Sequence, residues 1–239
     1  VSAARAGLGR YLALYNTVAR QRTGLTRADA VKQTSLGAYA ENSIQWNDKL
    51  RSIVGLRADK YRFNVNSNIA ENSGKADDKL VSPKFSLIAG PWAKTEFFAN
   101  IGNGFHSNDA RGATITLDPK TLQPVDKVNP LVKSRGSELG LRTEIIPNLQ
   151  TSLALWQLKS DSELLFVGDA GTTEASRPSK RHGIEWSTHY TPYKWLMLDM
   201  HLSGSKAHFT DNDATGNLIP GAIDKVASAG ITIDKLNNY

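Results

Sequence analysis

The chain has 239 residues, no cysteine, and a net charge of +6 from 29 basic and 23 acidic side chains. The basic excess is small and spread along the sequence, so we expect no nucleic-acid partner. The lack of cysteine excludes disulfides and thiolate metal sites. No run of about 18 apolar residues occurs, which excludes a helical membrane span. The sequence begins at Val1 with neither a methionine nor an apolar leader, so we expect a mature piece or an internal fragment.

Alternation of apolar and polar residues is the dominant pattern of the sequence. Because successive side chains of a strand point to opposite faces, this pattern predicts about ten strands. In chain order they are expected at 9–22, 31–46, 49–65, 80–90, 95–106, 134–146, 149–167, 179–190, 194–209 and 220–239. Several exceed the roughly five or six residues usual in soluble domains. The first segment is ambiguous, and a helix there stays an alternative.

The alternation gives each predicted strand one apolar and one polar face. It runs over 138–145, 183–190 and 196–203. We predict that the apolar faces point outward to lipid and the polar faces inward. The outward residues include Leu139, Leu141, Ile184, Trp186, Leu196 and Leu198.

The connections between the predicted strands alternate in length. Tight turns rich in Pro, Asn and Asp are expected at 47–48, 91–94, 147–148 and 191–193. Long polar connections are expected at 66–79, 107–133, 168–178 and 210–219. A transmembrane barrel has short periplasmic turns at one end and long extracellular loops at the other. The predicted fold class is therefore all-β: a segment of an antiparallel up-and-down transmembrane β-barrel.

Aromatic residues lie near both ends of the predicted strands. Such rings are typical of the two membrane interfaces of a barrel, although strands are rich in aromatics in any case. Beside the short turns are Trp46, Trp92, Tyr190, Tyr193 and Trp195, and at the long-loop ends are Tyr61, Phe63, Phe105, Phe166 and Phe209.

Three stretches carry a family resemblance: 82–85 (SPKF), 102–105 (GNGF) and 132–142 (VKSRGSELGLR). In this order and spacing they resemble the barrel of TonB-dependent outer-membrane receptors. The resemblance extends over 31–239. It implies a barrel of about 22 strands around an N-terminal plug, which takes up a scarce ligand such as a siderophore across the outer membrane of a Gram-negative bacterium when TonB pulls on the plug.

The sequence departs from that pattern in several ways. No plug, TonB box or signal peptide is recognised, about ten strands cannot close such a barrel, and the last residues lack an aromatic-ended closing strand. We therefore expect 1–239 to form a partial barrel domain from the later part of such a receptor, with TonB acting only through the missing plug.

The resemblance implies a transporter that captures its ligand with loops and lumen. The residues expected to contact the ligand are His106, Asn108, Asp109 and Arg111 on the longest loop, and Arg142, Glu144, Glu185, Asp199 and His201 on the inward faces. Lipid and lipopolysaccharide are the other expected partners. The basic group 179–181 (SKR) is interpreted as a solvated strand end that touches the anionic lipopolysaccharide.

The stretch 106–109 (HSND) is similar to the H-x-S-N-G pattern of outer-membrane phospholipases. In that pattern one residue separates His and Ser, so both lie on the same strand face and share a hydrogen bond. His106 and Ser107 are adjacent and point to opposite faces, so we predict no catalytic residue. His189 and His201 are possible neighbours across the 191–193 turn, but the histidines lack metal-site spacing, and we predict neither a metal nor a cofactor.

Two alternatives remain open. A passive porin has the same strands and turns but no plug. A secreted β-sandwich binding module keeps the loops, but it has no reason to place apolar residues on an outer face.

Overall fold

The computed structural model describes residues 27–167, 172–175 and 177–234, so the segment 9–22 lies outside the described residues. Nine strands form one antiparallel sheet in the order β1-β2-β3-β4-β5-β6-β9-β10-β11, and β7 pairs with β8 in a separate hairpin. The strands are β1 (Asp29–Asn47), β2 (Leu50–Ser67), β3 (Gly74–Trp92), β4 (Thr95–Ser107), β5 (Leu131–Thr143), β6 (Leu149–Ser160), β7 (Leu164–Val167), β8 (Thr172–Ala175), β9 (Ser179–Tyr193), β10 (Leu196–Phe209) and β11 (Lys225–Ile233). The predicted all-β, up-and-down arrangement is confirmed.

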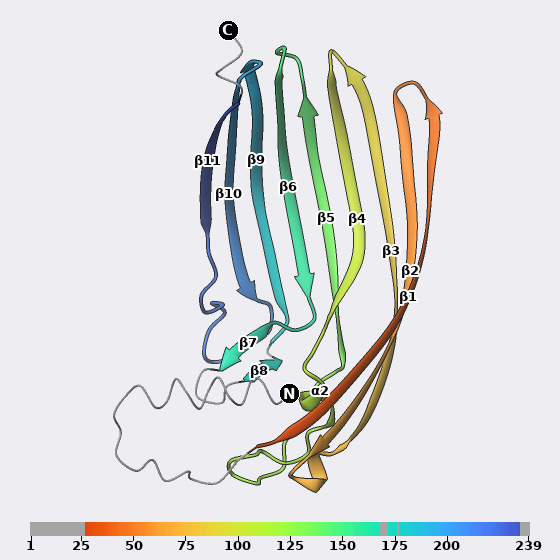
Figure 1. The fold of residues 1–239 in the computed structure, drawn as a ribbon, viewed down its shortest axis with the longest axis vertical. Helices are drawn as coiled ribbons and strands as arrows, with labels where there is room; N and C mark the ends of the chain where they lie inside the picture. Colours follow the sequence, from red (N-terminus) through yellow and green to blue (C-terminus); the bar gives the residue numbers. More distant parts are fainter. Residues whose placement is uncertain (1–26, 168–171, 176, 235–239) are drawn as a thin grey trace, which may run out of the picture.

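The short turns gather at one end of the strands and the long connections at the other (Figure 1). Short turns follow β1, β3, β5 and β9, and long connections follow β2, β4, β6 and β10, as the sequence predicts. Among the described residues, β1 and β11 each pair on one side only, so the sheet is open. Of the helices in the described part of the chain, none is long and apolar enough to cross a membrane, a finding that concerns helices alone.

The strand register separates the sheet into an apolar face and a polar face. One row across the sheet places Leu139 opposite Leu155 and Leu155 opposite Ile184. The next row joins Leu141, Leu153, Trp186 and Leu202. We call the side with these rows the apolar face, and Leu139 there is 60% exposed. The opposite side, the polar face, carries Glu96, Glu138, Arg142 and Asp199.

The β-sandwich alternative is wrong. A sandwich needs a second sheet packed over one face of the first. The described residues contain one other sheet, the β7–β8 hairpin of two four-residue strands. Large apolar side chains on the main sheet stay exposed, including Leu36, Leu56, Val81 and Leu155.

The prediction of a single strand over 149–167 is wrong. β6 ends at Ser160, where its ladder with β9 ends at the pair Ser160 and Ser179. The Ser160 hydroxyl then donates to the carbonyl of Ser162 at 2.8 Å, which fixes a turn in the polar run 159–163. Past this turn, β7 pairs with β8 instead of continuing the main sheet.

Two long connections are more ordered than predicted. β3 begins at Gly74 and not near residue 80, and a 3₁₀ turn, η1 (Ala70–Asn72), fills the connection before it. The connection 107–133 contains the short helix α2 (Ala110–Thr114) and ends where β5 starts at Leu131. Both departures from the prediction lie at the long-connection end of the strands, past the apolar rows. Polar residues occupy both faces there, so alternation no longer marks where a strand ends.

A small core lies under these connections. Phe63 and Val65 of β2 pack with Ala110 of α2, and Tyr61 and Ala76 lie against them. Phe63 is 1% exposed, and Phe209 is buried with the Arg177 guanidinium 4.4 Å from its ring centre. The interpretation of these two rings as interface aromatics is therefore wrong. At the short turns, Trp46, Trp92 and Tyr193 are exposed.

Candidate functional site

The predicted ligand residues lie in two groups at opposite ends of the strands. His106, Asn108, Asp109 and Arg111 lie where β4 leads into α2, at the long-loop end. Arg142, Glu144, Asp199 and His201 line one pocket at the short-turn end of the polar face. Glu185 belongs to neither group, because it lies further along β9 between Ala154 and Ser203.

Asp109 and Arg111 organise the start of α2. The Asp109 carboxylate accepts the backbone N–H of Arg111 at 2.8 Å and pairs with the Arg111 guanidinium at 2.5 Å. The hydrogen bond from the Arg111 side chain lowers the pKa of Asp109 below its usual value, although partial burial opposes this shift. Asp109 is therefore ionised at neutral pH, and both side chains are partly exposed.

Asn108 and His106 face the interior of the loop cluster. Asn108 is 3% exposed, its Nδ2 donates to the Asn129 carbonyl at 2.7 Å, and its backbone N–H donates to the Pro130 carbonyl at 2.9 Å. The Asn108 Oδ1 and the His106 Nε2 are buried without a hydrogen-bond partner among the described residues. Asn108 thus joins the two ends of the long connection, and its ligand role stays a prediction.

Asn72, which the sequence analysis did not select, joins two long connections. It lies in η1 and is 3% exposed. Its Oδ1 accepts the backbone N–H groups of Thr116 and Leu117, each at 2.9 Å, and its Nδ2 donates to the Leu117 carbonyl at 2.8 Å. A lone Asn in a polar loop carries no sequence signal for such a role, because the partner backbone is 45 residues away.

The pocket at the short-turn end holds paired charges. His189 Nδ1 lies 2.7 Å from Asp199 Oδ1, and His189 also lines this pocket. Glu96 accepts from Arg142 Nε at 2.6 Å and lies 3.5 Å from Arg51 Nη2. The sequence pointed to His189 only as a possible neighbour of His201, and both line this pocket. Its pairing with Asp199, and the roles of Glu96 and Arg51, were not predicted, because cross-strand partners are known only once the register is fixed.

The polar face continues toward the long connections with further polar contacts. The Asn100 amide donates to the Glu138 carboxylate at 2.9 Å across β4 and β5. Arg181 of β9 pairs with Glu163 at 2.9 Å, and the Ser179 hydroxyl donates to the same carboxylate. This face offers carboxylates, cations, amides and hydroxyls to a polar partner. Nowhere in the described ranges do three or more His, Asp or Glu side chains form a group able to hold a metal ion.

Solved structures share this fold. The alcaligin outer-membrane receptor from Bordetella pertussis matches with 19% identity and a TM-score of 0.61 over 86% of this chain and 35% of its own. The ferric yersiniabactin uptake receptor from Yersinia pestis matches with 15% identity and a TM-score of 0.64 over 86% and 32%. The ferric-catecholate import receptor from E. coli K12 matches with 11% identity and a TM-score of 0.67 over 87% and 33%.

The chain thus spans about a third of the length of these structures. No curated protein matches it. The family model described as "TonB dependent receptor-like, beta-barrel" matches residues 4–237, which is nearly the whole sequence. The chain therefore belongs to the family of TonB-dependent receptor-like β-barrels.

Proposed function

We propose that this chain is part of the outer-membrane barrel of a receptor that takes up a scarce small ligand, such as a ferric siderophore, with energy delivered through TonB. The observation that carries the proposal is the family match over 4–237. Two of the similar structures named above are described as receptors for ferric ligands, which makes this ligand class the first to test.

In this proposal the apolar face meets lipid and the polar face lines the lumen. Leu139, Leu155 and Ile184 form a continuous exposed row, and exposure of such rows to water is unfavourable by about 25 cal/mol per Å². The charged groups of the polar face, such as Glu96 and Arg142, then avoid the hydrocarbon, where a charge costs several kcal/mol. Bilayer insertion satisfies both faces at once.

The long connections belong on the extracellular side, and His106, Asp109 and Arg111 are proposed ligand contacts there. Arg142, Glu144, Glu185, Asp199 and His201 are proposed to face the lumen or a plug domain of the longer protein. TonB acts on that plug and not on these residues. The role is transport, and no side chain of this chain is assigned a catalytic step.

The test is an uptake assay with the full-length protein. It is expressed in a bacterium that lacks its own ferric-siderophore receptors. Uptake of each radiolabelled ferric siderophore of a panel is then measured, together with growth on that siderophore under iron limitation. The proposal predicts uptake of at least one ligand that disappears when TonB is deleted. Uptake that continues without TonB would contradict it.

A passive porin remains the alternative within membranes. A porin conducts ions through an open lumen, so the full-length protein in a planar bilayer would show steady, large single-channel conductance without TonB. The receptor proposal predicts a closed barrel with little conductance under the same conditions.

A further inference from the structure

The apolar face changes to a band of cations near the long connections. From the row of Leu139, Leu155 and Ile184 toward the long connections, the next residues on this face are polar and then basic. Arg135 lies opposite Lys159, and Lys159 lies opposite Lys180 on the next strand. Three cations are therefore cross-strand neighbours on β5, β6 and β9. Like charges directly opposite each other destabilise a sheet.

No carboxylate of the described residues pairs with these cations. Ion pairs of the polar face show the contrast, because Arg181, the next residue after Lys180, pairs there with Glu163. Lys180 points to the other face by strand alternation and lacks a comparable partner among the ion pairs of the described chain. A row of uncompensated cations is stabilised when an anion lies against it.

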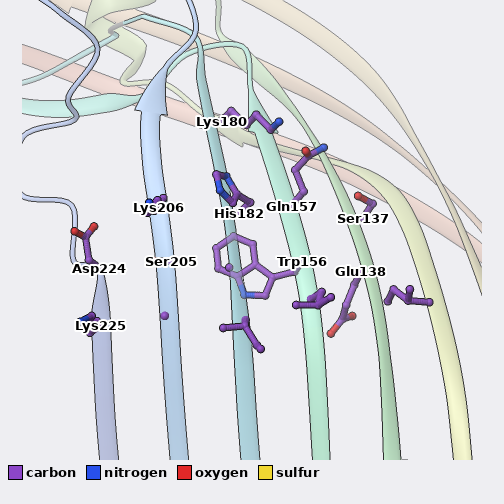
Figure 2. A pocket seen from close by; sticks show the side chains of 15 residues that line it. Ser137, Glu138, Trp156, Gln157, Lys180, His182, Ser205, Lys206, Asp224 and Lys225 are labelled. Atoms are coloured by element: carbon purple, nitrogen blue, oxygen red, sulfur yellow. The ribbon is translucent and has the colours of Figure 1, made fainter.

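A groove lies on this part of the face. It is lined at one end by the apolar side chains of Leu155 and Ile184, and toward the long connections by Lys180, His182, Lys206 and Lys225. Figure 2 shows Lys180, His182, Lys206 and Lys225 on the neighbouring strands β9, β10 and β11. Two carboxylates also belong to the lining: Glu138, which accepts the Asn100 amide on the polar face, and Asp224, which forms no ion pair within 4 Å among the described residues. The groove thus joins a hydrocarbon-compatible end to a cationic end.

We propose that this groove binds the phosphorylated headgroup of a lipid in the outer leaflet, with the phosphate against Lys180, Lys206 and Lys225 and an acyl chain along Leu155 and Ile184. This site rests on the proposed function, because it requires the apolar face to meet the outer membrane. Lipopolysaccharide has the required chemistry of phosphates above acyl chains. A free phosphate would use the cationic end alone and would leave the apolar end of the groove exposed.

Lipid binding by the full-length protein tests the site. The purified protein is placed in nanodiscs of phosphatidylethanolamine that contain lipid A with two phosphates, lipid A without phosphates, or phosphatidylglycerol. Native mass spectrometry then measures the affinity for each lipid. The test variant is Lys180→Gln/Lys206→Gln/Lys225→Gln. The charge-matched control is Lys49→Gln/Lys94→Gln/Lys194→Gln, which removes three exposed lysines at the short turns.

The site predicts that the wild type selects phosphorylated lipid A and that the test variant binds it about a hundredfold more weakly, since each lysine near an anionic lipid contributes about fivefold. Replacing the same three lysines by arginine keeps the charge and should retain binding. If the triple variant does not fold, Lys206→Gln alone should still weaken binding about fivefold. The turn-end control should bind as the wild type does.

Three results would overturn the site: wild-type affinity in the test variant, an equal loss in the turn-end control, or equal binding of lipid A with and without its phosphates. Equal binding of phosphatidylglycerol and phosphorylated lipid A would overturn lipopolysaccharide as the ligand. If the proposed function itself is wrong, the result differs from these three, because the wild-type protein would then fail to insert into the nanodisc or would show no uptake. Insertion and uptake without lipid selectivity would reject the groove alone.

Discussion

Single side chains fix the long connection between β4 and β5. Asp109 caps α2 and pairs with Arg111, Asn108 joins both ends of the connection, and Asn72 holds its middle. These contacts turn a polar segment that the sequence presents as irregular into a packed structure over Phe63. Any ligand that binds there meets a preorganised surface, which reduces the entropy cost of binding.

Replacing Asp109 by Asn should loosen this connection and change its response to pH. The pKa of Asp109 is lowered by the hydrogen bond from Arg111, so its contribution is present above the unfolded pKa of about 3.9 and is lost as the pH falls through the lower folded value. Asparagine can still cap α2 but cannot form the ion pair with Arg111, so amide hydrogen exchange over 109–116, corrected for intrinsic rates, should show a loss of protection of about 0.5–1 kcal/mol at pH 7 in the variant.

The wild type should lose the same protection below about pH 4, whereas the Asn variant should respond less to acid. Asp126→Asn is the control, because Asp126 is an exposed residue of the same connection. Equal acid sensitivity in wild type and Asp109→Asn would show that Arg111 does not act through this carboxylate.

Replacing Asn72 by Ala should release the connection from η1. The change removes one donated and two accepted hydrogen bonds and takes their Asn72 partner from partly buried backbone groups of Thr116 and Leu117, at a local cost of about 2 kcal/mol. Trypsin should then cleave at Lys120 or Lys127 faster than in the wild type. Asn64→Ala removes an exposed amide of β2 and should leave the cleavage rate unchanged. Equal rates in all three proteins would disprove the Asn72 role.

Within the strands, close packing depends on a few glycines. A Cβ atom at Gly183 of β9 would lie 2.6 Å from the Gly204 carbonyl oxygen and 2.9 Å from Trp156 Cζ2. Both contacts are shorter than side chains tolerate, and one involves backbone of the neighbouring strand. Gly204 of β10 is different, because the nearest atom to a Cβ there is Ile184 Cγ2 at 3.8 Å.

Gly183→Ala should therefore destabilise the β9–β10 pair by about 1–3 kcal/mol, whereas Gly204→Ala should be close to neutral. The readout is the temperature at which the full-length barrel loses its folded mobility on a gel. A lower temperature for Gly204→Ala than for Gly183→Ala would contradict the strand packing described above.

The sequence predicts those strands best whose side chains alternate between lipid-compatible and polar groups. β5, β9 and β10 fall close to their expected positions because Leu139, Ile184 and Leu198 mark one face with a period of two. The rule fails beyond the apolar rows, where β3 starts earlier than expected and β7 leaves the sheet. Pairs such as Glu96 with Arg142 depend on register, which is set by turn geometry and by packing along the whole strand.

As a whole, the described chain is an open curved sheet with one exposed apolar face and two edge strands, β1 and β11. Unpaired edges are templates for association. Residues 1–239 made alone should therefore aggregate without detergent, as measured by light scattering after refolding. A folded, monodisperse monomer in plain buffer would contradict the assignment of the apolar face to lipid.

The orientation of the barrel in the membrane is the most direct test of the proposed receptor. The chain lacks cysteine, so single cysteines at Gln123 in the long connection and at Asn148 in a short turn are unique labelling sites in this part of the protein. Intact cells that express the full-length protein are treated with a membrane-impermeant maleimide. We expect labelling at residue 123 and none at residue 148 until the outer membrane is permeabilised. Labelling at residue 148 in intact cells, with residue 123 protected, would contradict this orientation.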